Sequence, residues 1–177
     1  MRANRYYLLL FIGLSYFSNV YAQENQGSQK LDVYTESLPP YQMLSNEQIV
    51  GIATTRVEAL LTEAGLPYQL HLVPWARAYS AVNQQSHSLI YSMLHSAERE
   101  QQFQWLAVVA KVKNCFVSLA DSDLALTSIA DIAPYVTGVI RNGYAHSFLL
   151  EHGFVENKHL FVLATTEEQL HLLLAKK

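Results

Sequence analysis

The chain has 177 residues, of which 50% are hydrophobic and 15% are charged, with a net charge of −3 and one cysteine. These figures exclude an intrinsically disordered chain, an internal disulfide framework and the dense positive charge that nucleic acid binding requires, so we expect no nucleic acid partner. The length fits one ordinary domain or two small lobes.

Residues 1–22 have the three-part pattern of a secretory signal peptide. Arg2 and Arg5 form a basic start, an apolar run follows over residues 6–17, and residues 20–22 (Val-Tyr-Ala) fit a cleavage site after Ala22. The apolar run is shorter than the roughly 20 residues of a membrane span, although an uncleaved anchor is the alternative. Cleavage removes two of the 12 basic residues and none of the 15 acidic ones, so the net charge falls from −3 to −5. We therefore expect a periplasmic protein.

After a polar stretch over residues 23–30, which we expect to be flexible, strand and helix patterns alternate. Apolar residues in the i, i+3, i+4, i+7 order predict a helix over residues 51–64, and Gly65 ends it. Helical spacing resumes at Trp75, and a polar helix start follows at residues 96–100. Alternating or apolar runs predict strands at residues 31–36, 68–73 and 88–94.

Residues 104–119 form a long, β-rich run that exceeds an ordinary strand of about five or six residues. We interpret it as a strand that leaves one lobe and enters another near residues 112–115. Cys115 lies within its apolar part, so we expect a buried, inert thiol.

Beyond residue 119 the alternation continues. A short helix over residues 128–132 ends before Pro134, and residues 165–168 (Thr-Thr-Glu-Glu) form a capping box that opens a final helix through Leu174. Strands are expected at residues 135–140 and 159–164, with a helix at 145–152 between them. Strands that alternate with helices across short loops indicate an α/β fold with mainly parallel sheets.

The sequence shows no pattern typical of a metal or catalytic site. Of the seven histidines, His146 and His152 are six residues apart and point to different helix faces, and no His-Glu-x-x-His or Cys-x-x-Cys motif occurs. No Gly-x-Ser-x-Gly turn or phosphate-binding glycine loop is present. We expect no metal, no cofactor and no enzymatic activity, with an exported enzyme that pairs Cys115 with a histidine as an alternative.

Charged, polar and aromatic residues follow three predicted strands. Glu36 and Tyr41 follow the first, Trp75 follows the second, and Ser92 and Arg99 accompany the third. Because ligands of open α/β sheets bind beyond the carboxyl ends of the strands, these side chains can converge on one site.

Five motifs occur in a fixed order along residues 34–105: Tyr34-Thr35-Glu36-x-x-Pro39-Pro40-Tyr41, Gly51-Ile52, Val73-Pro74-Trp75-Ala76-Arg77-Ala78, Ala97-Glu98-Arg99-Glu100 and Phe103-x-Trp105. With this order and a signal peptide, the chain resembles the extracytoplasmic solute-binding proteins of family 3, which are periplasmic receptors for polar amino acids and similar solutes. The resemblance implies two α/β lobes that close on a ligand. The expected divisions are lobe I at residues 31–112, a hinge at 113–118 and a partial lobe II at 119–177.

The resemblance also implies roles for single residues. Arg99 matches the arginine that clamps the ligand carboxylate with its guanidinium fork, whereas an exposed arginine paired with Glu98 or Glu100 is the alternative. Trp75 matches an aromatic that covers the ligand, or else a core aromatic. Tyr41 and Glu36 would line the cleft, and Glu36 would take a ligand ammonium or remain a solvated strand end.

Four further residues complete the expected ligand site. Arg77 would hold a second anionic group or form a surface ion pair. Ser92 would hydrogen-bond the ligand at a strand end. Arg141 and Asn142 lie between a strand and a helix of the second lobe, where the family presents helix N-terminal amides to an anion.

The chain departs from the family pattern after its last predicted helix. The second hinge strand, an acidic partner for the ligand ammonium and the closing elements of both lobes are not found, so we expect a C-terminally truncated form with an incomplete second lobe. A fragment, a degenerate copy and a chain completed by a partner are the three explanations. The expected function is capture of an amino-acid-like solute for ABC-type uptake through a permease, and the alternative is a sensory module of the same fold.

Overall fold

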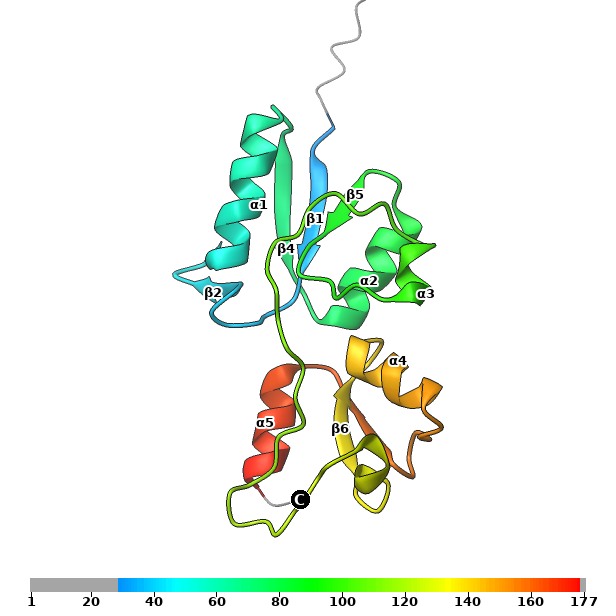
Figure 1. The fold of residues 1–177 in the computed structure, drawn as a ribbon. Helices are drawn as coiled ribbons and strands as arrows, with labels where there is room; N and C mark the ends of the chain where they lie inside the picture. Colours follow the sequence, from blue (N-terminus) through cyan, green and yellow to red (C-terminus); the bar gives the residue numbers. More distant parts are fainter. Residues whose placement is uncertain (1–28, 176–177) are drawn as a thin grey trace, which may run out of the picture.

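The structure is a computed structural model that describes residues 29–175, and it shows two α/β lobes, one above the other in Figure 1. The predicted signal peptide at residues 1–22 and most of the 23–30 stretch lie outside the described residues. No helix among residues 29–175 combines the length and the apolar character needed to cross a membrane.

Lobe I is built on a parallel sheet of three strands in the order β4-β1-β5, which are Tyr68–Leu72, Leu31–Thr35 and Ser88–Ile90. Helices α1 (Ile52–Glu63) and α2 (Trp75–Gln84) connect these strands in the βαβ manner, as the helical spacing predicts. The apolar residues of the two layers form one buried cluster that consists of Val33, Ala53, Val57, Leu61 and Tyr91.

A short hairpin precedes α1, and no pattern in the sequence predicted it. Strands β2 (Met43–Ser45) and β3 (Gln48–Val50) pair antiparallel around Asn46 and Glu47, whose φ angles are 49° and 63°. Two successive residues with positive φ are typical of the tight turn that matches the twist of a hairpin. The hairpin leads into Gly51 at φ 134°, where an added Cβ would lie 2.3 Å from the carbonyl oxygen of Tyr41. A residue with a Cβ would clash with the Tyr41 backbone, so only glycine allows α1 to begin at this position.

Lobe II has its own smaller core. Strands β6 (Thr137–Ile140) and β7 (Leu160–Leu163) pair in parallel, and the 3₁₀ helix η1 (Ile129–Ile132), α4 (Tyr144–Glu151) and α5 (Thr166–Leu174) accompany them. The buried cluster of this lobe consists of Ile132, Val139, Leu149, Phe154 and Leu160. The prediction of an α/β fold with parallel sheets is thus confirmed for both lobes.

The crossing between the lobes corrects the prediction of a long strand. Residues 104–119 run from lobe I into lobe II (Figure 1) but form no strand, because no segment among the described residues pairs with them. The prediction that the strand over 88–94 continues past Ile90 is also wrong, since Ser92 has a φ of 62° and turns the chain away.

Cys115 is exposed, so the expectation of a buried thiol is wrong. Its apolar neighbours share this exposure, and the side chain of Val117 is 74% exposed. The physical reason is the lack of a partner strand: an isolated extended segment buries neither its edges nor its faces.

The separate core of lobe II leads to a prediction. Leu149 is 0% exposed, whereas its neighbour Leu150 is 41% exposed on the same helix. Leu149→Ala should lower the free energy of unfolding by about 2–5 kcal/mol, because it deletes buried methyl groups and leaves a cavity. Leu150→Ala, the matched control, should change it by less than about 1 kcal/mol. Urea unfolding followed by circular dichroism measures both, and equal losses would contradict this core.

Candidate functional site

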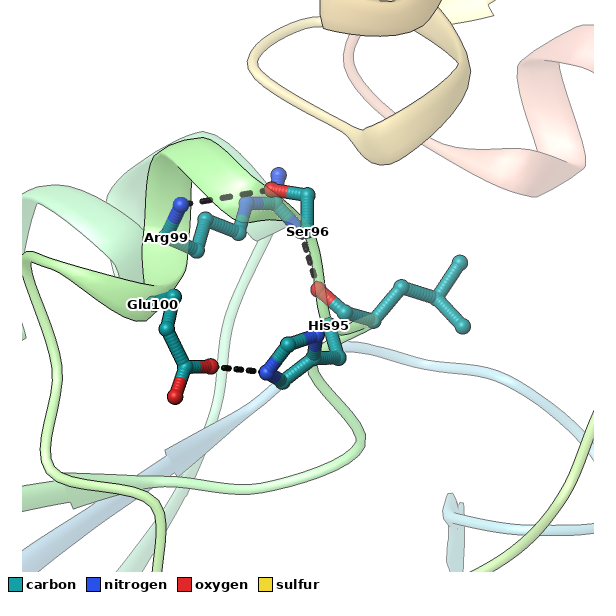
Figure 2. Close-up of polar contacts among 5 residues, drawn as sticks. His95, Ser96, Arg99 and Glu100 are labelled. Atoms are coloured by element: carbon teal, nitrogen blue, oxygen red, sulfur yellow. Dashed lines mark hydrogen bonds and ion pairs between the residues drawn. The ribbon is translucent and has the colours of Figure 1, made fainter.

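The lobes meet at Arg99, which belongs to the short helix α3 (Ala97–Glu100) and is only 3% exposed. Ser96 caps this helix by accepting the backbone N–H of Arg99 at 3.3 Å, which fixes the start of the side chain (Figure 2). The guanidinium donates from Nη1 to the carbonyl oxygen of Leu94 at 3.1 Å and from Nη2 to that of Asn142 at 2.9 Å. The second bond joins lobe I to lobe II.

The alternative of an exposed Arg99 paired with Glu98 or Glu100 does not match the structure. Glu100 contacts His95 instead, as Figure 2 shows, and Arg99 is buried. Burial is the main cause that lowers the pKa of Arg99, and the Tyr79 and Glu98 charges oppose it more weakly. Within the described residues, no carboxylate oxygen forms an ion pair with this guanidinium.

Aromatic rings surround the guanidinium on the lobe I side. The Cζ atom of Arg99 lies 5.4 Å from the ring centre of Trp75 and 5.5 Å from that of Tyr79, distances at which cation–π attraction operates. Trp75 is 3% exposed, and its indole Nε1 donates to the carbonyl oxygen of Asn142 at 2.7 Å. Trp75 thus combines the burial of a core aromatic with a polar edge that faces lobe II.

Asn142 supplies the lobe II side of this junction through its main chain. It lies between β6 and α4 with a φ of 57°, in the left-handed region, and its one carbonyl oxygen accepts from both Trp75 and Arg99. Its neighbour Arg141 is exposed, and the backbone N–H of Arg141 donates to Leu163 in β7. The structure therefore brings a backbone carbonyl, rather than the Arg141 side chain, to Arg99.

A second contact between the lobes lies at the end of β1. Ser37 donates from Oγ to Oε1 of Glu167, near the start of α5, at 3.1 Å. The adjacent Glu36 is half-buried, and its pKa rises from 4.5 to about 7, mainly through burial and further through the charge of Glu167. This arrangement of the lobes therefore brings the two carboxylates of Glu36 and Glu167 close enough to repel each other.

The other expected lobe I residues take different positions. Ser92 donates from Oγ to Oε1 of Gln42 at 2.9 Å, and Gln42 is fully buried with no partner for its Nε2 among the described residues. Tyr41 is half-buried against the lobe I core and its carbonyl oxygen accepts from the backbone N–H of Ala53, whereas Arg77 is exposed on α2.

Sequence reasoning missed Gln42, Tyr79 and Glu167 as residues of this region. Gln42 follows Tyr41 directly, Tyr79 lies one helical turn after Trp75, and Glu167 belongs to the predicted capping box, so adjacency and helical spacing were the available signals. A cavity of about 170 Å³ opens beside Arg99 between the lobes, and it is lined by Ser96, Ala97, Glu98 and Arg99 of lobe I and by Tyr144, Ser147, Phe148 and Glu151 of α4. Residues 29–175 contain no group of three or more His, Cys, Asp or Glu side chains placed to hold a metal ion.

Two α/β lobes with parallel sheets, joined by a crossing segment, define a two-lobed fold like that of periplasmic binding proteins. The model of the bacterial extracellular solute-binding proteins, family 3, matches residues 31–173, and the chain belongs to this family. The family resemblance drawn from the motifs is thereby confirmed. No curated protein sequence matches the chain.

Solved structures share the fold at low sequence identity. A histidine kinase sensor domain with similarity to periplasmic binding proteins is 20% identical with a TM-score of 0.67. The arginine-, lysine-, histidine-binding protein ArtJ from Geobacillus stearothermophilus is 18% identical with a TM-score of 0.65. The substrate-binding protein AbpA from Streptococcus pneumoniae, bound to L-arginine, is 17% identical with a TM-score of 0.61. Each match covers 84% of this chain and 64% of the other, so the chain spans less than two thirds of these structures.

The shifted pKa of Glu36 leads to a prediction about stability. Because its pKa is about 7 in the folded protein against 4.5 ordinarily, the folded state binds more protons than the unfolded state between these pH values. The contribution of Glu36 to the free energy of unfolding should therefore fall as the pH rises from 4.5 to about 7. Glu36→Gln should flatten this slope, and Glu167→Gln should reduce it, in urea unfolding at a series of pH values.

Glu63→Gln is the matched control, since Glu63 is exposed at the end of α1. It should leave the slope as it is in the wild type. An unchanged slope in Glu36→Gln would show that Glu36 does not retain its proton near neutral pH.

Proposed function

We propose that this protein captures an amino-acid-like solute between its lobes and holds its carboxylate on Arg99. The observation that carries the proposal is a guanidinium 3% exposed with no carboxylate partner among the described residues. A buried cation is costly unless an anion compensates it. The carbonyl oxygens of Leu94 and Asn142 each accept one N–H of the guanidinium, which carries further N–H donors, and these oxygens carry no charge. A ligand carboxylate would supply that charge and a bidentate hydrogen-bond pair.

We assign the rest of such a ligand to the other expected site residues. Trp75 and Tyr41 would pack its apolar part, and Glu36 would take its ammonium, which would also relieve the repulsion from Glu167. We further propose that Ser92 hydrogen-bonds the ligand. Arg77 would hold a second anionic group, and Arg141 and Asn142 would engage the ligand from lobe II.

Lobe closure would trap the solute, as in hinge-type binding proteins. We propose that residues 1–22 direct export to the periplasm and that residues 113–118 act as the hinge. The similarity to AbpA, an amino acid ABC transporter substrate-binding protein, supports delivery to a membrane permease. We propose no catalytic role, because the family and these neighbours are binding proteins.

A sensory module of the same fold is the second candidate function. The observation in its favour is the similarity to a histidine kinase sensor domain, with a TM-score of 0.67. Neighbouring genes separate the two: permease and ATPase genes favour uptake, whereas a kinase or cyclase gene favours sensing.

Ligand capture is tested by thermal unfolding in the presence of each of the common amino acids. A bound amino acid should raise the melting temperature, because it binds the folded state alone. Arg99→Ala should raise the dissociation constant of that amino acid by at least about 30-fold, since truncation of a buried charge partner costs 2 kcal/mol or more.

Arg99→Met is the companion variant, because it keeps most of the side-chain volume and removes the charge. Lys158→Ala, in the exposed turn before β7, is the control and should retain the thermal shift. Undiminished amino acid binding by both Arg99 variants would show that the clamp is assigned wrongly.

A further inference from the structure

His146 is a buried polar residue that the ligand site described above does not use. It lies in the first turn of α4 and is 5% exposed. Its Nδ1 accepts the backbone N–H of Asn142 at 3.2 Å, and its Nε2 lies 2.9 Å from Oε1 of Glu156, in the loop before β7. Both ring nitrogens are thus engaged, one by the loop after β6 and the other by a carboxylate.

This geometry selects one form of the imidazole. Because Nδ1 accepts an N–H, it carries no proton, and the ring is neutral with its hydrogen on Nε2. Nε2–H then donates to the Glu156 carboxylate, which holds the ring in the orientation that points Nδ1 at Asn142. Glu156 is the charged group that faces His146 in the described contacts.

Backbone hydrogen bonds also hold the loop that His146 contacts, among them the bond from the N–H of Arg141 to the carbonyl oxygen of Leu163 at 2.9 Å. Gly143 donates its backbone N–H to Ile140 at 2.9 Å, and this N–H shares a peptide unit with the Asn142 carbonyl. Asn142 itself is at φ 57°, a conformation that a residue with a side chain adopts at a cost. The bond from the backbone N–H of Asn142 to His146 holds the peptide unit before Asn142, and the bond from Gly143 holds the unit after it. Together the two bonds offset this cost and fix the direction in which the carbonyl oxygen points.

That carbonyl oxygen is the acceptor for Trp75 and Arg99 at 2.7 and 2.9 Å. We propose that His146 and Glu156 are positioning residues for lobe closure: Glu156 orients His146, His146 holds the Asn142 loop in its left-handed conformation, and the loop presents its carbonyl to lobe I. This proposal rests on the proposed function, because the arrangement would stabilise closure of the lobes around a solute. The hydrogen bonds that support the proposal form without a ligand.

The two tryptophans allow a direct test. In protein labelled with ¹⁵N at the indole nitrogens, hydrogen exchange of Trp75 Nε1–H reports the bond to Asn142, and that of Trp105 serves as the internal reference. Trp75→Phe assigns the two signals. His146→Leu and Glu156→Leu should each speed exchange at Trp75 about five- to tenfold, the equivalent of one lost hydrogen bond, and leave Trp105 unchanged.

Conservative variants separate positioning from a merely structural role. His146→Asn can place an amide oxygen near the position of Nδ1 and should restore slow exchange, and Glu156→Gln should do the same by keeping an acceptor. His152→Leu is the matched control on the same α4 segment, because His152 contacts only the Phe148 carbonyl oxygen of its own helix in the described hydrogen bonds. It should leave Trp75 exchange unchanged.

Circular dichroism first confirms that each variant is folded, and Glu156→Leu replaces His146→Leu if the latter does not fold. Equal Trp75 exchange in the wild type and in folded His146→Leu or Glu156→Leu, whether slow or fast in both, overturns the proposal. Because the experiment is done without ligand, this failure is distinct from the failure of amino acid binding, which the Arg99 variants test.

Discussion

A buried guanidinium at the junction of two lobes is the constraint on which the rest of this site depends. Arg99 donates one N–H each to the main-chain carbonyl oxygens of Leu94 and Asn142 and lies near two aromatic rings, yet none of the described carboxylates pairs with it. Neutral acceptors and ring faces reduce the cost of burying a cation without removing it. An anion that enters between the lobes would remove this cost.

The lobes are suited to relative movement because each has its own core. The described links between them are few and polar: the Asn142 carbonyl with Trp75 and Arg99, and Ser37 with Glu167. Polar links of this kind contribute about 1 kcal/mol each, so a ligand with modest differential affinity can shift the balance between open and closed forms. The placement of Glu36 beside Glu167 adds a penalty on closure that a proton or a ligand ammonium would relieve.

The segment that crosses between the lobes is anchored on lobe I near Val109 and is largely exposed beyond that point. Val109 packs against the lobe I core and Arg56 donates to its carbonyl oxygen, but further along residues 104–119 the side chains are largely exposed, Cys115 included. The residues there have the β-branched and aromatic character of a strand. A strand forms only beside a partner that accepts and donates its backbone hydrogen bonds, and the described residues offer none. The chain spans 64% of the length of the structures it resembles.

The sequence by itself determined the local elements and the chemical types at their ends. Helical spacing and Gly65 predicted α1, strand patterns predicted β1 and β4, and the motifs singled out Trp75 and Arg99. These features can be predicted because the spacing of buried side chains and the chemistry of each functional group follow directly from the order of the residues. Only the tertiary structure decided that the lobe II partner of Arg99 is the carbonyl oxygen of Asn142, that the charge of Glu167 acts on Glu36, and that His146 accepts the backbone N–H of Asn142. A carbonyl is present at every residue, and its direction depends on a left-handed φ and on the approach of two lobes, neither of which a pattern of side chains encodes.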